Sequence, residues 1–292
     1  MSKNNNNYLK FFQIILTCLF LYYAFKIANV NFSEVFEKIQ ISTFSLFSIS
    51  FLAVSIILFT TFLNSLRFKF IVESILLLKL TILQSFRICL SSLLLGVVFN
   101  TGIGADIYRF LLFKNKDRKL NILIMLFIDR FYPFLYLLLF QLIFLFFYFK
   151  NTLYLILLFF FILFYFCSKK IIVKLTKLDL FFHEKNFSFS INILLYIISF
   201  SILIYISSKI FNVDLEFYKI LIFSPFILFA HNIPLFVSGF GSRELAMLYI
   251  FSNYSSKDDI FLVSFFLGIM FLITPLFGLF DIKNIKNLHF PK

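Results

Sequence analysis

Long uncharged stretches constrain this chain more than any other feature of its sequence. The long apolar intervals between charged residues cover residues 39–66, 131–149, 151–168, 186–208, 220–242 and 260–280. Shorter apolar candidates cover residues 11–25 and 88–105. An α-helix crosses the hydrocarbon core of a bilayer with about 20 mostly apolar residues. With 61% hydrophobic and 14% charged residues, the sequence predicts an all-α integral membrane protein with no room for a soluble domain.

The positions of Lys and Arg predict how the helices are oriented. One basic cluster lies at residues 114–119 and another at residues 169–185. Cytoplasmic loops are enriched in these residues, so we expect both clusters inside. If every apolar interval crossed the membrane, the basic loop at residues 67–79 would lie opposite the cluster at 114–119. The conflict disappears if residues of about 84–113 and 220–254 are re-entrant hairpins that enter from opposite faces.

This topology predicts a single polytopic membrane domain over residues 1–292, with six full crossings and two opposed hairpins; eight full crossings are the alternative. It leaves these basic residues on the outer side: Lys26, Lys38, Lys150, Lys209, Lys219, Arg243 and Lys257. We expect the protein in the cell (cytoplasmic) membrane, with its N- and C-termini in the cytoplasm.

Both proposed hairpins contain a Gly-x-Gly sequence, although the whole chain has only 7 Gly residues. The first pair is Gly102 and Gly104, and the second is Gly239 and Gly241. Each pair is followed closely by an acidic residue and an Arg. Glycine lets the backbone leave the helix, and such breaks within a membrane are tolerated where they are buried or line a cavity. Related breaks on opposite faces predict an inverted repeat, an architecture in which transporter sites form between half-helices.

The helices that restart after these breaks favour an anionic ligand. Their N-termini carry free N–H groups and the positive end of the helix dipole. Arg109 and Arg243 add guanidinium groups whose geometry suits phosphate oxygens. Asp106 and Glu244 are expected to balance these Arg residues in the empty site or to carry a coupling proton. The alternative is that both acids are ordinary first-turn residues and both Gly pairs ordinary turns.

Asp129 and Arg130 are charged residues inside an apolar interval, where charges are costly and are expected to be paired or functional. Neighbouring residues on a helix point about 100° apart, so the two are not expected to pair with each other. We expect Asp129 to pair with Arg109 or Arg243, and Arg130 to pair with Asp106 or Glu244. A structural ion pair and substrate contact are equally compatible with this pattern.

Three further polar residues, Asn100, His231 and Asn232, lie at the depth of the hairpins. His231 has no second His or carboxylate at helical spacing, which favours a hydrogen-bonded packing role over a ligand.

The order of these motifs resembles the flippase-like membrane family that includes the transmembrane region of lysylphosphatidylglycerol synthases. The resemblance rests on the segment from Asn100 to Arg109, on Asp129 and Arg130, and on Pro234, Gly239, Gly241, Arg243 and Glu244. Arg67 resembles an early Arg of the same family. This chain departs from the family pattern at Thr101, where the first motif usually has Pro, and at Ala105, which replaces a Gly.

The resemblance implies a flippase or transporter that moves an anionic lipid or lipid-linked substrate across the membrane. An aminoacyl-phospholipid or a polyprenyl-phosphate sugar would be such a substrate. The substrate-binding candidates are Asn100, Gly102, Gly104, Asp106, Arg109, Asp129, Arg130, Pro234, Gly239, Gly241, Arg243 and Glu244. Lysyl transfer belongs to a soluble C-terminal domain of that family. This chain ends at Lys292, soon after its last apolar interval, so we do not expect an enzyme.

Two other classes of function are alternatives to transport. A membrane enzyme or accessory subunit acting on a polyprenyl phosphate or phospholipid would need an acidic pair or a His cluster, and Asp258 and Asp259 are the only adjacent acids. A helix start explains that pair equally well. A non-catalytic scaffold would leave the buried charges and paired Gly breaks unexplained. The dispersed Cys and His residues predict no metal site and no cofactor. The clustering of Lys and Arg in loops predicts membrane orientation and not nucleic acid binding, and the resemblance implies a membrane lipid or lipid-linked anionic substrate as the partner.

The opposed hairpins generate a labelling prediction. Cysteines introduced at Lys116 and at Lys257 should react with a membrane-impermeant reagent from opposite faces, because the positive-inside rule separates these two positions. The parent protein, with its own three Cys residues, gives the background. Labelling of both positions from the same face would contradict the opposed-hairpin topology.

Overall fold

The computed structural model describes residues 15, 17–24, 26–28, 43–99, 103–114, 119–162, 179–233, 236 and 239–279. Within these ranges every regular element is a helix, and no strand is present. The prediction of an all-α membrane architecture is therefore confirmed.

Four helices are long and apolar enough to cross a membrane. The first two are α3 (Thr43–Ile75) and α6 (Lys119–Phe149). The others are α8 (Asp179–Ile210) and α11 (Lys257–Ile273), which continues into the 3-10 helix η2 (Thr274–Gly278). They contain most or all of four predicted crossings, and shorter apolar helices lie at Thr17–Ala28 and Thr152–Ile162. The chain therefore has the architecture of a multi-pass membrane protein.

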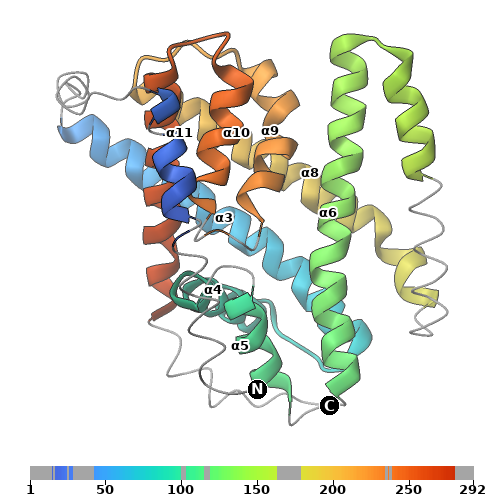
Figure 1. Ribbon diagram of the computed structural model, residues 1–292. Helices are drawn as coiled ribbons and strands as arrows, with labels where there is room; N and C mark the ends of the chain where they lie inside the picture. Colours follow the sequence, from blue (N-terminus) through green and yellow to red (C-terminus); the bar gives the residue numbers. More distant parts are fainter. Residues whose placement is uncertain are drawn as a thin grey trace.

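Two pairs of shorter helices occupy the regions predicted as hairpins. The first pair is α4 (Ile82–Phe99) and α5 (Ile103–Phe113), and the second is α9 (Phe217–His231) and α10 (Ser242–Phe251). At 1.5 Å per residue, the 11 residues of α5 and the 10 residues of α10 reach only about halfway through the hydrocarbon core. In Figure 1 the α4 and α5 pair lies at the lower end of the molecule, and α9 and α10 lie at the upper end. The side of the membrane toward which each pair opens stays a prediction.

The long helices hold the two short pairs between them. Figure 1 shows α3 and α8 running obliquely across the molecule, with α6 upright on one side and α11 on the other. In the contacts between helices, α3 packs against α4, α6 and α8, while α9 packs against α6, α8 and α10. Buried apolar side chains from all the long helices form one continuous cluster. This packing holds both short pairs against the long helices.

Helix α9 contains Pro225, and its neighbours supply the hydrogen bonds that the proline disturbs. Pro225 has no N–H to give to Leu221, and Ser224 Oγ instead donates to the Leu221 carbonyl at 3.0 Å. The Phe226 N–H donates to Gln141 Oε1 of α6 at 2.9 Å. Gln141 is a buried amide in an otherwise apolar part of α6, so this bond explains its presence there.

This contact generates a prediction about stability. Gln141→Leu should lower the free energy of unfolding by about 1–3 kcal/mol, because it leaves the Phe226 N–H without an acceptor. The loss should shrink in a Pro225→Ala background, where a regular α9 can pair that N–H within its own backbone. Unfolding of the four proteins of this double-mutant cycle in detergent gives the coupling. An equal loss in both backgrounds would contradict this assignment.

Candidate functional site

A cavity of about 640 Å³ lies between the first helix pair and the ends of α9 and α11. Apolar side chains form much of its wall, including Leu93, Phe131 and Phe271. Its polar wall consists of Thr60, Thr61, Asn64, Arg67, Cys89, Asp106, Arg109, Asp129, Arg130, Tyr196, His231, Asn232 and Thr274. A large, mostly apolar cavity with a few convergent charged groups is the usual form of a binding site for an amphipathic ligand.

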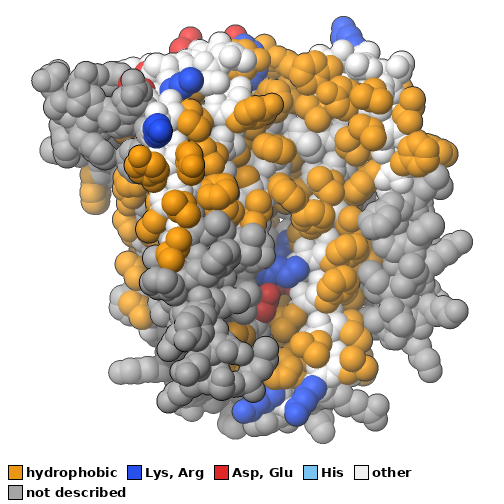
Figure 2. Space-filling view, viewed as in Figure 1, with side chains coloured by type: hydrophobic (Ala, Val, Ile, Leu, Met, Phe, Trp, Pro, Cys, Tyr) orange, Lys and Arg blue, Asp and Glu red, His pale blue; other side chains and the backbone are white. Residues whose placement is uncertain are grey.

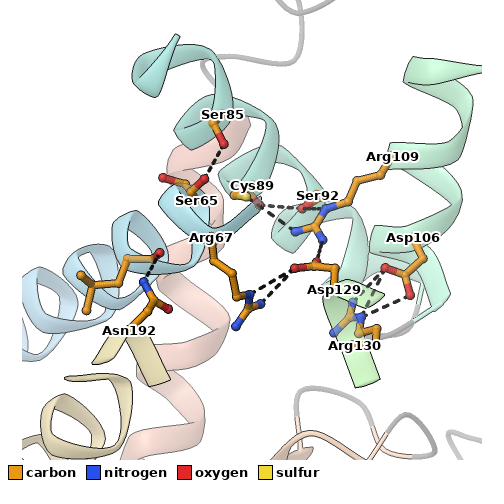
Figure 3. A network of polar contacts seen from close by, with 11 residues as sticks. Ser65, Arg67, Ser85, Cys89, Ser92, Asp106, Arg109, Asp129, Arg130 and Asn192 are labelled. Carbon is orange, nitrogen blue, oxygen red and sulfur yellow. Dashed lines mark hydrogen bonds and ion pairs between the residues drawn. The ribbon is translucent and has the colours of Figure 1, made fainter. Parts of the chain in front are cut away.

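Asp129 of α6 is the centre of the charged wall, and it is shared by two arginines. Arg67 of α3 donates from Nε and Nη2 to its Oδ1, at 3.2 and 3.1 Å. Arg109 of α5 donates from Nη1 to its Oδ2 at 2.5 Å. Figure 3 shows the two guanidinium groups reaching the carboxylate from different helices. The side chain of Asp129 is only 4% exposed, so both oxygens receive their partners inside the protein.

Arg109 is engaged at all of its guanidinium nitrogens. Besides the bond to Asp129, its Nε donates to Ser92 Oγ at 3.2 Å and its Nη2 to Cys89 Sγ at 3.7 Å, both on α4. Its guanidinium carbon lies 4.5 Å from the centre of the Phe68 ring, which adds a cation–π contact. Arg109 therefore joins α4, α5 and α6 and holds Asp129 in place.

Arg130, the neighbour of Asp129 on α6, pairs with Asp106 near the start of α5. Its Nη2 lies 3.1 Å from Asp106 Oδ1, and its Nε also donates to both carboxylate oxygens at 3.3 Å. The side chains are 45% and 27% exposed, far more than those of the Asp129 pairs. The space-filling view in Figure 2 shows basic and acidic side chains together in a hollow that has hydrophobic side chains beside it. This pair therefore lies at the open part of the cavity.

The second helix pair has a different local geometry at its break. Gly239 and Gly241 have φ angles of 69° and 88°, which side chains with a Cβ rarely adopt. This backbone leads into α10, whose first turn is capped by Glu244: its Oε2 accepts from the Gly241 N–H at 2.5 Å. The Gly-x-Gly break and the acid that follows it thus act together as the start of a helix.

Arg243 and Glu244 form a sealed ion pair and do not line the cavity. Both side chains are 0% exposed, and Arg243 Nη2 donates to Glu244 Oε1. Arg243 Nε donates to Ser264 Oγ of α11 at 3.2 Å, and Nη1 lies 3.5 Å from His231 Nδ1. His231 does line the cavity, and its ring centroid lies 4.6 Å from that of Phe271. His231 therefore separates this pair from the cavity and packs as an aromatic residue.

The structure brings together four of the predicted site residues around the cavity, namely Asp106, Arg109, Asp129 and Arg130. It confirms the pairing of Asp129 with Arg109 and of Arg130 with Asp106. Gly104 is buried in the first turn of α5, whereas Gly239, Gly241, Arg243 and Glu244 form the start of α10. The remaining candidates, Asn100, Gly102 and Pro234, lie outside the described residues.

Arg67 has only a minor place among the residues predicted from the motifs, and its polar neighbours on α3 are not among them. Thr60, Asn64 and Arg67 all line the cavity. They are spaced by four and three residues, so they lie on one face of the helix. Polar residues with this spacing in a long apolar interval are a signal that the sequence does contain. The adjacent acids Asp258 and Asp259 belong to the first turn of α11, where Ser256 Oγ accepts from the Asp259 N–H at 3.3 Å.

Comparison with known families decides to which group of membrane proteins the chain belongs. Residues 10–278 match the family described as Lysylphosphatidylglycerol synthase TM region. The chain belongs to this family. The match includes both helix breaks and every residue of the Asp129 network, so the lysylphosphatidylglycerol synthase TM region is represented over nearly the whole chain. Searches of curated proteins and of solved structures found no match.

Membership in the lysylphosphatidylglycerol synthase TM region family confirms the resemblance that the motifs indicate. Together with the long apolar helices, it identifies a multi-pass membrane protein related to lipid or cell-envelope processes. Among the described residues, no group of three or more His, Cys, Asp or Glu side chains is placed to hold a metal ion.

The sealed pair generates a second prediction about stability. Arg243→Met should destabilise the protein by about 3–5 kcal/mol, because Glu244 would keep a buried charge without its cation. Arg243→Met combined with Glu244→Gln removes both charges and should recover most of that loss. Unfolding in detergent measures both variants against the parent. If the double variant is as unstable as the single one, the pair does not stabilise the start of α10 by charge compensation.

Proposed function

We propose that this protein moves an anionic lipid or lipid-linked substrate across the cell membrane, with the headgroup held in the cavity. Under this proposal it acts as a flippase or transporter and not as an enzyme, and both termini lie in the cytoplasm. The observation that carries the proposal is a charged cavity whose open part lies in an apolar outer face of the helix bundle.

The position of the exposed charges supports a lipid as the substrate. Arg130 and Asp106 are flanked by exposed apolar side chains, among them Phe127, Phe134 and Ile107. Apolar surface of this kind faces the acyl chains of the bilayer in a membrane protein. A ligand that reaches the cavity through this face can keep its chains in the membrane while its headgroup enters the protein.

The donors in the cavity favour an anionic headgroup. Arg67 and Arg130 line the cavity on α3 and α6, and guanidinium groups bind phosphate oxygens through paired, charge-assisted hydrogen bonds. Both carboxylates of the cavity are paired with arginine, so they hold these donors in position. Fixed donors on rigid helices can exchange water for phosphate oxygens with little rearrangement.

Half-helices on both sides of the cavity support movement of the ligand. Ala105 and Asp106 near the start of α5 line the cavity, and so does His231 at the end of α9, so residues beside the break of each helix pair reach the same cavity. Transporters with related broken helices place their substrate where such ends meet near the middle of the membrane. The expected inverted repeat of the two pairs is part of this proposal.

Translocation in reconstituted vesicles tests the proposal. The full chain is placed in liposomes with a trace of fluorescent phosphatidylglycerol, and an impermeant quencher reports how much probe changes leaflet. Arg67→Gln and Arg130→Gln should each slow translocation about ten- to hundredfold, since a hydrogen bond to a charged group contributes about 1.5–3 kcal/mol. Asp129 keeps Arg109 as its partner in the first variant, which favours normal insertion.

Arg87→Gln is the matched control, because it makes the same change on α4 at a residue that is not part of the cavity wall. It should translocate the probe at the parent rate. Equal rates for the parent, the two cavity variants and empty liposomes would refute the transport proposal. Chemical conversion of the probe without a change of leaflet would show an enzyme instead.

A further inference from the structure

The wall of the cavity carries more positive than negative side chains, and the surplus lies at the arginines that share Asp129. Arg67 and Arg109 share the single carboxylate of Asp129. Arg130 and Asp106 balance each other. Among the described charged residues of the cavity wall, one positive charge is therefore left over.

The neighbouring groups do not change this balance. Arg243 and Glu244 are paired behind the wall. Arginine has only donors, so the contact from Arg243 Nη1 to His231 Nδ1 requires an imidazole with a free lone pair on that nitrogen, which is the neutral form. His231 therefore adds a polar surface to the cavity and no charge.

The surplus charge is presented to the cavity by Arg67. Its Nε and Nη2 are used by Asp129, whereas its Nη1 makes no hydrogen bond or ion pair within the described ranges. Figure 3 shows a nitrogen of this guanidinium without a partner among the residues drawn. Arg109 is fully engaged, so Arg67 carries the donor that is open to a ligand.

From this geometry we infer that the cavity selects headgroups with one net negative charge, namely phosphodiesters, over zwitterionic, doubly negative and cationic headgroups. The inference rests on the proposed function and specifies the class of its substrate. An uncompensated charge is costly at low dielectric, and a singly negative headgroup cancels the surplus. A phosphomonoester or diphosphate reverses the sign of the cavity charge, and a zwitterionic headgroup leaves it in place.

The proposed function covers several anionic lipids and lipid-linked substrates, and this charge balance distinguishes among them by the net charge of the headgroup. A phosphodiester that joins glycerol or a sugar to a lipid has one negative charge. An aminoacyl-phospholipid with additional ammonium groups has a positive net charge and would add to the surplus. The inference therefore favours an unmodified phosphatidylglycerol type or a polyprenyl phosphosugar.

Lipid binding to the purified full chain in detergent tests the inference separately from transport. The probes have identical acyl chains and are phosphatidylglycerol, phosphatidylcholine and phosphatidic acid, the last used near pH 8, where a phosphomonoester is almost doubly ionised. Native mass spectrometry counts the bound lipid. The parent should prefer phosphatidylglycerol about tenfold over each of the others, a difference of about 1.4 kcal/mol.

Variants at the Asp106 and Arg130 pair change the net charge without touching the Asp129 network. Arg130→Gln removes the surplus and should move the preference toward phosphatidylcholine. Asp106→Asn removes a negative charge, which makes the net charge of the cavity more positive by one. The preference should then move toward phosphatidic acid. The double variant restores the original charge, so it should restore the order of preference even where total binding is weaker. This reciprocal shift is not expected from damage to the fold.

The outcomes separate the two proposals. Preferential binding of phosphatidylglycerol without translocation in vesicles upholds the charge selection and refutes transport. Equal binding of all three probes, or single variants with the parent's preference, overturns the charge selection even if transport is observed. Competition then compares lipid types: displacement of phosphatidylglycerol by a polyprenyl phosphosugar supports the inference, and displacement by a polyprenyl diphosphate alone overturns it.

Discussion

One carboxylate shared between two arginines organises the centre of this protein. Asp129 on α6 receives Arg67 from α3 and Arg109 from α5, and Arg109 continues the network to α4. A charge at this depth is tolerated only with partners, so the helices that carry these partners must approach α6. The cavity lies beside this network, and Arg67, Arg109 and Asp129 all line it.

The two helix breaks show how similar sequences produce different environments. In both pairs an Arg donates from Nε to a Ser hydroxyl at 3.2 Å, Ser92 for Arg109 and Ser264 for Arg243. The acid that neutralises Arg109 comes from another helix, across the cavity wall. The acid that neutralises Arg243 is its own neighbour, Glu244, which also caps the helix start. The first Arg therefore lines the cavity, and the second is sealed inside the protein.

The sequence predicts the helical class, both breaks and the partners of Asp129 and Arg130, since each depends on a local rule about apolar length, glycine or buried charge. It does not predict that Asp129 takes a second arginine, because the approach of α3 depends on the packing of the whole bundle. It also does not predict the contact between Arg243 and Glu244. Side chains of neighbouring helical residues diverge, and these two meet because Glu244 turns back toward the Gly241 N–H at the start of α10.

The bond from Phe226 to Gln141 has a mechanical consequence. The backbone donor that follows Pro225 in α9 has an acceptor on another helix. Sliding α9 along α6 would break this bond and leave both polar groups facing hydrocarbon, which is costly. The hydroxyls of Ser201 on α8 and Ser224 on α9, 2.8 Å apart, resist the same displacement from the other side. These two bonds hold α9 in register with α6 and α8, so a rocking motion that keeps them intact would have its shear plane elsewhere in the bundle.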